Sequence, residues 1–82
     1  MLEYQFSIFW DDETSIWVAD SQDLPGHVVE NISFDTLIEQ VKASVSELLE
    51  LSGKENTQVK ILFKAERSAT VLTRPAEEWY YS

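Results

Sequence analysis

From Tyr4 to Trp10 the apolar residues occur at every second position, and the residues between them are mostly polar. A period of two is typical of a β-strand with one face turned into a core. The polar stretch 11–15 follows, and after it the segment 16–21 is again β-branched and aromatic. Residues 3–21 are therefore predicted to form an antiparallel hairpin. Its inward positions on the first strand are Tyr4, Phe6, Ile8 and Trp10.

A sharp chain reversal is predicted at Leu24-Pro25-Gly26-His27. Pro25 presets φ at the second position of the turn and Gly26 accepts positive φ at the third, which is the signature of a type II β-turn. The short β-branched segment 27–32 follows this structural turn. We expect it to return beside the hairpin as the third strand of a meander.

The apolar spacing changes to three and four after residue 33, which indicates an amphipathic helix. Ser33 can cap the first free N–H groups, and Gly53 can end the helix in the left-handed conformation. The predicted helix therefore spans residues 34–51. Its apolar stripe is Phe34, Leu37, Ile38, Val41, Val45, Leu48 and Leu49.

Residues 57–66 alternate once more and form the predicted fourth strand. A right-handed crossover through the helix places this strand parallel to the third and beside the first. The expected fold is thus an α+β two-layer sandwich, β-β-β-α-β, with sheet order 3-2-1-4 and one covering helix. Residues 68–72 offer an extra edge strand. We expect a domain over residues 1–66 and a C-terminal extension over 67–82 that packs on the domain or on a second subunit.

The charge and composition of the chain exclude some classes of function and favour others. The chain has 82 residues, 15 acids against six Lys and Arg, and a net charge of −9, which disfavours direct contact with nucleic acid and favours a basic partner. It has no cysteine, so thiolate metal sites and cysteine nucleophiles are excluded. We find neither a signal peptide nor a membrane span and expect a soluble, cytoplasmic protein.

The hairpin ending in Trp17-Val18-Ala19, the segment "DLPG" and the strand-to-helix segment "VVENISFDTLIEQVKASVSELLEL" together resemble the HicB-like antitoxin domain. The likeness covers residues 4–51 and is closest to short, single-domain members of that family. It implies a partial ribonuclease-H-like fold and binding to a small basic toxin of the HicA-like kind. Longer members carry a DNA-binding domain, for which this chain has no room.

The sequence gives little support for a catalytic site. Metal-dependent nuclease chemistry needs carboxylates that converge at the centre of the first strand, and this strand has only Glu3 at its edge. His27 lies near Ser21 and Asp23 in sequence, but a structural histidine in a turn is the favoured reading. We therefore expect no enzyme activity, no cofactor and no metal. Three acids near the turn, Asp20, Asp23 and Glu30, are the alternative metal ligands.

We predict a non-enzymatic domain whose acidic surface binds a small basic protein. The apolar area left on the uncovered sheet face also predicts a homodimer. The alternatives are a stand-alone homodimeric module without a toxin partner and a small-molecule or metal-binding regulator. The aromatic residues near the C-terminus, Trp79, Tyr80 and Tyr81, are expected to cover the open sheet face or to contact a second subunit. The residues predicted to bind the partner are Asp11, Asp12, Trp17, Asp20, Asp23 and Glu30.

Overall fold

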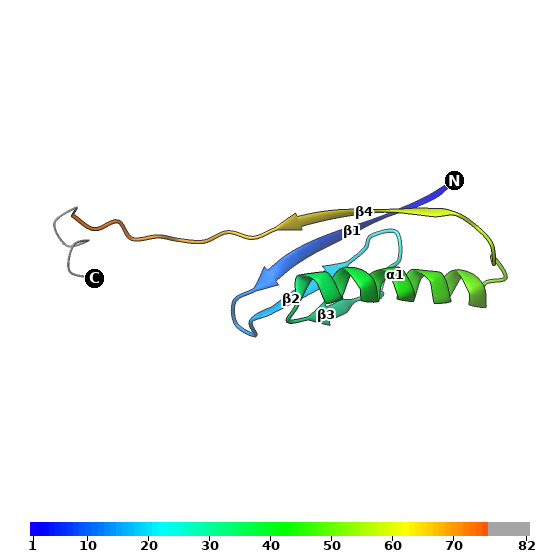
Figure 1. Cartoon of the computed structure of the whole chain (residues 1–82), viewed down its shortest axis with the longest axis horizontal. Helices are drawn as coiled ribbons and strands as arrows, with labels where there is room; N and C mark the ends of the chain where they lie inside the picture. The colour runs from blue at the N-terminus through cyan, green and yellow to red at the C-terminus, as the bar shows by residue number, and fades with distance from the viewer. Residues whose placement is uncertain (76–82) are drawn as a thin grey trace.

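The protein was analysed as a computed structural model that describes residues 1–75. Its elements follow the predicted order strand, strand, strand, helix, strand (Figure 1). The helix bounds agree with the prediction, whereas β1 extends one residue further at each end and β3 and β4 each begin two residues later than predicted. The elements are β1 (Leu2–Asp11), β2 (Ile16–Asp20), β3 (Val29–Asn31), α1 (Phe34–Leu51) and β4 (Val59–Glu66).

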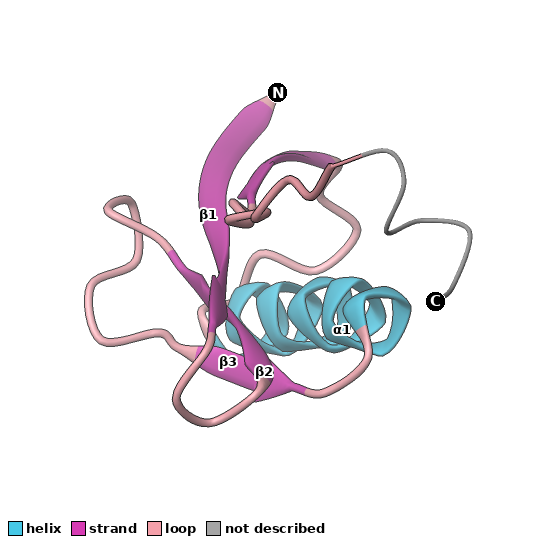
Figure 2. Ribbon diagram, turned by 90° about the vertical axis from the view of Figure 1, so that its left-hand side faces the viewer, coloured by secondary structure: helices cyan, strands magenta, loops and turns pink. Residues whose placement is uncertain are grey.

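The four strands form one mixed sheet in the order β3-β2-β1-β4, as predicted. β1 is antiparallel to β2 and parallel to β4, and β2 is antiparallel to β3. Seen nearly along the helix axis, α1 lies against one side of the twisted sheet, closest to β2 and β3 (Figure 2). The other face of the sheet has no covering element among residues 1–75. The fold is therefore an α+β two-layer arrangement.

Both ends of α1 are capped by side chains and backbone that the sequence placed there. The Ser33 hydroxyl accepts a hydrogen bond from the Thr36 backbone N–H, and Ser33 itself is extended. At the other end Gly53 has a φ of +75°, and its N–H donates to the Glu50 carbonyl while that of Lys54 donates to Leu49. This pair of bonds is the Schellman motif, so the helix stops where the glycine allows a left-handed residue.

The predicted turn is also present. Gly26 has a φ of +82°, and the His27 backbone N–H donates to the Leu24 carbonyl at 3.0 Å. This geometry is that of a type II turn with glycine at its third position. The turn lets the chain leave β2, cross the end of the sheet and return as β3.

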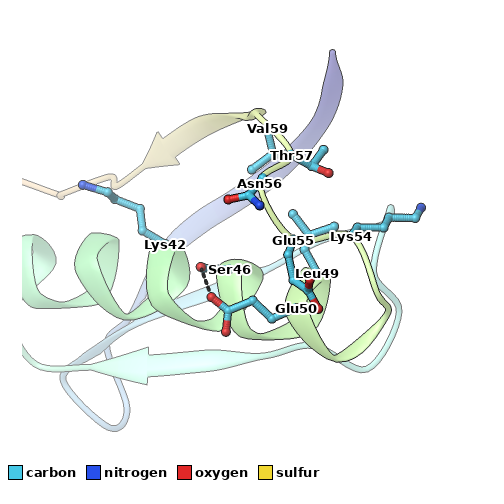
Figure 3. Close-up of a pocket in the computed structure, with 9 residues that line it drawn as sticks. All are labelled: Lys42, Ser46, Leu49, Glu50, Lys54, Glu55, Asn56, Thr57 and Val59. Atoms are coloured by element: carbon cyan, nitrogen blue, oxygen red, sulfur yellow. Dashed lines mark hydrogen bonds between the residues drawn. The ribbon is translucent and has the colours of Figure 1, made fainter.

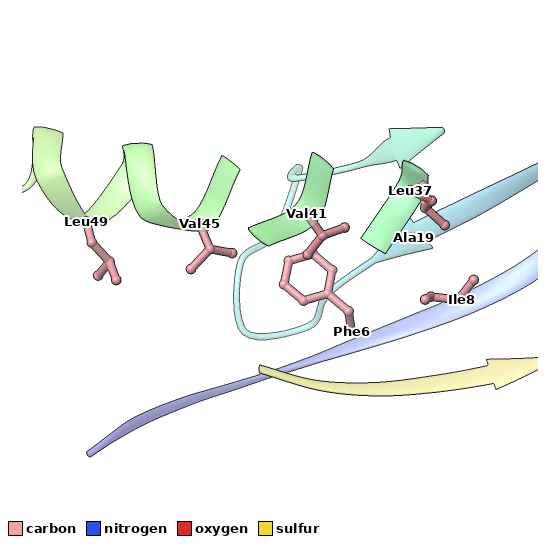
Figure 4. Packing of buried hydrophobic residues seen from close by; sticks show 7 residues of the cluster. All are labelled: Phe6, Ile8, Ala19, Leu37, Val41, Val45 and Leu49. Atoms are coloured by element: carbon pink, nitrogen blue, oxygen red, sulfur yellow. The ribbon is translucent and has the colours of Figure 1, made fainter. Parts of the chain in front are cut away.

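The core lies between α1 and the helix-facing side of β1 and β2 (Figure 4). The register sets this face: Ile8 is paired with Ala19 and Trp10 with Trp17, so these side chains point toward the helix together. Partly buried residues of β4 extend the core toward the sheet edge. The buried apolar residues are Phe6, Ile8, Ala19, Leu37, Val41, Val45 and Leu49.

One element of the expected fold is wrong. Residues 68–72 form no fifth strand; residues 67–75 run away from the sheet as an extended chain without regular structure (Figure 1). Val71 and Leu72 are 80% and 89% exposed. A strand needs a neighbour to satisfy its backbone groups, and the direction of this segment takes it beyond the end of β1.

Candidate functional site

The sheet face opposite α1 carries most of the predicted binding acids. Asp20 is paired with Ser7, and Glu30 with Val18, so both carboxylates project from the uncovered face. Both residues are exposed. On the same face, Val18 of β2 is paired with Phe9 of β1. We call Asp20, Glu30, Val18 and the hairpin acids Asp11 and Asp12 the acidic face.

Charge is unevenly distributed over the fold. Residues 1–41, which include β1, β2 and β3, contain no lysine or arginine, and all six basic residues follow them. Within residues 1–75 the salt bridge is between Lys42 and Glu39 on the helix surface, at 3.2 Å. The β2–β3 side of the sheet is therefore acidic, whereas Lys60 and Lys64 lie on β4 at the opposite edge.

Asp11 and Asp12 lie at the tip of the β1–β2 hairpin. The Asp11 carboxylate accepts a hydrogen bond from the Glu13 backbone N–H at 3.0 Å. The Ser15 N–H donates to the Asp11 carbonyl at 2.7 Å, and Ser15 adopts a φ of +57°. One oxygen of Asp11 thus shapes the turn, and the exposed Asp12 extends beside it.

Asp23 has a structural role that its predicted function did not include. Its carboxylate accepts the Gln5 backbone N–H at 2.8 Å, and the buried Ser21 hydroxyl donates to the Gln5 carbonyl at 2.6 Å. The Asp23 N–H in turn donates to the Ser21 oxygen at 3.1 Å. β2 ends at Asp20. The two side chains therefore give the Gln5 backbone the hydrogen bonds that a longer β2 would have given it.

Trp17 lies on the helix side of the sheet and not on the acidic face. Its ring packs edge-on against Trp10 and Phe34, with centroid distances of 5.3 Å and 5.1 Å. The Arg67 guanidinium lies over both indoles, 4.1 Å from the Trp10 centroid and 5.5 Å from that of Trp17. This cluster closes one end of the core, so Trp17 serves packing between the layers.

His27 is hydrogen-bonded neither to Ser21 nor to Asp23, its neighbours in the sequence. Its Nε2 atom is hydrogen-bonded to the Ser44 hydroxyl of α1, and its ring contacts Phe6 edge-on. Ser21 and Asp23 instead bind the Gln5 backbone. The histidine thus joins the Pro-Gly turn to the helix, which is the structural role that the sequence favoured.

Several hollows lie on the described part of the protein. One lies over β1 and β4 on the uncovered sheet face, holds about 430 Å³, and is lined by residues that include Phe9, Lys64 and Glu66. Another lies between the end of α1 and the start of β4, holds about 110 Å³, and is lined by residues that include Lys42, Glu50 and Thr57 (Figure 3). Drug-sized ligands occupy clefts of at least about 300 Å³. Within residues 1–75 no three His, Cys, Asp or Glu side chains converge as metal ligands, and no helix there is long and apolar enough to cross a membrane.

Sequence reasoning did not find two contributors to the fold. Arg67 follows β4 directly and continues its helix-facing side, a position that alternation along the strand could have indicated. Ser44 lies one position before the buried Val45 on the helix, and nothing local connects it with His27. The predicted aromatic contacts Trp79, Tyr80 and Tyr81 lie outside the described residues.

Comparison with known proteins gave two matches. Residues 3–74 match a family described as a domain of unknown function, DUF1902. The fold is similar to the crystal structure of the hypothetical protein TTHA1013 from the extremely thermophilic bacterium Thermus thermophilus, with a TM-score of 0.59 and 27% identity. That similarity covers 87% of this chain and 99% of the other. No curated protein matches the sequence. The family match spans most of the chain, and the chain therefore belongs to the DUF1902 family of domains of unknown function.

Proposed function

We propose that the protein is a non-enzymatic binding domain of the HicB antitoxin type, which works in the cytoplasm and holds a small basic protein on its acidic face. The observation that carries this proposal is the segregation of charge: residues 1–41 hold no lysine or arginine. Asp20 and Glu30 project from the same uncovered face as Val18. A HicA-like toxin is the partner class that the family resemblance implies.

The physical argument combines charge with apolar surface. Surface acids without basic neighbours create a negative potential that speeds encounter with a positive partner. Affinity then needs apolar contact at the centre of the interface. Val18 lies between the acids of β2 and β3 and the exposed Phe9 of β1, which is 43% exposed. The face thus offers both an acidic rim and an apolar centre.

The proposal is tested with charge reversal. A tagged chain is purified from its native host, any small basic protein that co-purifies is identified, and the two proteins are recombined and measured by calorimetry. The double variant Asp20→Lys, Glu30→Lys should weaken binding by about tenfold or more, because attraction becomes repulsion. Glu47→Lys, Glu50→Lys on exposed positions of α1 is the control with the same change in net charge.

Two results would contradict the proposal. The first is equal binding by both double variants, which would place the partner elsewhere on the molecule. The second is that no basic protein binds the wild-type chain and that the neighbouring reading frames encode none. Binding that weakens strongly as salt is added would support the electrostatic part of the argument.

A homodimeric module is the second candidate, and one observation favours it. β4 forms an outer edge of the sheet, and within residues 1–75 no other segment pairs with its second side. The chain then continues past β4 with exposed apolar residues. A second copy would satisfy this edge without using the acidic face.

A further inference from the structure

The edge of the sheet formed by β4 is long for an unpaired strand. β4 has eight residues, and an open edge of that length presents a row of backbone donors and acceptors to other chains. Its helix-facing residues Val59, Ile61 and Phe63 are only partly buried, because α1 packs over β2 and β3. The β4 edge therefore has backbone groups without a strand partner and apolar side chains that are only partly buried.

The charges on β4 select one way of pairing two copies. When β4 strands pair antiparallel about a two-fold axis, residues at equal distances from the axis lie opposite one another. With Phe63 at the axis, Lys60, three residues before it, lies opposite Glu66 of the second copy, three residues after it. The symmetry repeats this contact, so two pairs of opposite charge form across the junction.

Neighbouring registers are less favourable. An axis at Leu62 brings Lys60 opposite Lys64 of the second copy, and an axis at Lys64 brings the two Lys64 side chains together; like charges placed opposite destabilise a sheet. An axis at Ala65 pairs Lys64 with Glu66, but then only the last few residues of the two strands overlap. Strand length and charge together favour the axis at Phe63.

We propose that two copies of this chain associate through β4, antiparallel and with Phe63 on the two-fold axis, to form one continuous eight-stranded sheet. This inference rests on the homodimer candidate and names its surface. Lysines on edge strands usually discourage pairing. Here Lys60 lies opposite Glu66 of the second copy, so the lysine attracts the other strand in a register in which the two strands overlap over most of their length. On the helix-facing side the two Phe63 rings meet and extend the apolar row that runs from Phe6, whose centroid is 6.4 Å from that of Phe63.

The same register places the extended segment beside the second copy. Arg67 lies opposite Val59 of the second copy, so residues after Arg67 run past the start of that strand toward the loop that follows its helix. Leu51, at the end of the helix, is 80% exposed, as is Val71 in the segment. Contact between these residues of different copies would remove both from water.

The experiment uses the full chain and charge reversal at both positions. Wild-type protein is expected to sediment as a dimer. Lys60→Glu and Glu66→Lys should each raise the dimer dissociation constant by about tenfold or more, because each turns both cross-strand pairs into like charges. An equimolar mixture of the two variants should recover the dimer. In the mixed dimer both acids of one variant lie opposite both lysines of the other, so each cross-strand pair again joins opposite charges. Glu47→Lys and Lys42→Glu on the helix surface are the controls.

A second measurement uses the absence of cysteine from the chain. Lys60→Cys and Glu66→Cys variants, mixed and oxidised, should form a disulfide between different copies, and neither variant alone should do so. Circular dichroism checks that each variant folds.

Three outcomes would overturn the inference: a monomeric wild type, a dimer that ignores both reversals, and a cysteine mixture that forms no disulfide between copies. The first also removes the homodimer candidate, whereas the second leaves a dimer through another face. None of them affects the basic partner, which is tested at Asp20 and Glu30.

Discussion

At the scale of single residues, the segment 21–23 continues the pairing of β1 after β2 has ended. Ser21 and Asp23 bind the carbonyl and the N–H of Gln5, which would otherwise lack a strand partner on that side. The acid in this segment is therefore part of the fold, because its carboxylate is held against β1.

Ser21→Ala should lower the free energy of unfolding by about 1–2 kcal/mol, because the Gln5 carbonyl loses its donor at a part-buried site. Asp23→Ala should cost about 1 kcal/mol by freeing the Gln5 N–H. Gln22→Ala, at the exposed position between them, is the control and should stay within about 0.5 kcal/mol of wild type. Urea unfolding measures all three; equal stability throughout would show that these bonds are not needed.

Gly26 supplies the positive φ of the type II turn, and no atom lies within 4 Å of the place where its Cβ would be. Gly26→Ala should therefore destabilise the fold by about 1 kcal/mol through backbone strain alone. Gly26→Asn should cost less, because asparagine tolerates the left-handed region better. Thermal unfolding of both variants checks this order, which a steric clash would reverse, since asparagine is larger.

At the scale of elements, the cluster of Trp10, Trp17 and Phe34 joins β1, β2 and the first turn of α1, and Arg67 covers it from the end of β4. One side chain thus connects the last strand with the two central ones. It also orients the start of the extended segment.

Arg67→Ala should lower stability by about 0.5–1 kcal/mol, since an arginine over partly exposed indoles contributes about that much. It should also change tryptophan fluorescence, because the indoles gain contact with water. Arg74→Ala removes the same charge from an exposed position in the extended segment and should change neither quantity. A similar effect of both variants would mean that net charge, and not ring contact, is responsible.

At the scale of the whole molecule, a net charge of −9 is spread over 82 residues, and most acids of residues 1–41 face solvent. Repulsion among like charges destabilises a compact state, and salt screens it. The acidic face that suits a basic partner therefore lowers the stability of the isolated domain.

Raising sodium chloride from low to physiological concentration should increase the melting temperature by a few degrees, on the order of 1 kcal/mol for a domain of this size. Asp12→Lys, which reduces the negative charge at the hairpin tip, should be more stable than wild type at low salt and respond less to added salt. A melting temperature that falls with salt would show that attractive pairs dominate instead.

The elements could be predicted because their signals are local. Alternation in β1 and β4 and the stripe of α1 depend only on neighbours in sequence, and Ser33, Gly26 and Gly53 act within a few residues. The surroundings of two predicted site residues did not follow from such local signals. Trp17 and Asp23 were assigned to a binding surface, but one packs toward the helix and the other binds Gln5.

The sequence by itself determined the order of elements, the helix ends, the Pro-Gly turn and the acidic balance, since each follows from residue chemistry over a short span. Only the tertiary structure decided which aromatic residues face the helix, what Ser21, Asp23 and His27 bind, and that β4 lies at an open edge. These depend on the register between strands that are distant in sequence, and a shift of one residue would exchange the two faces. Periodicity within a single strand does not contain that information.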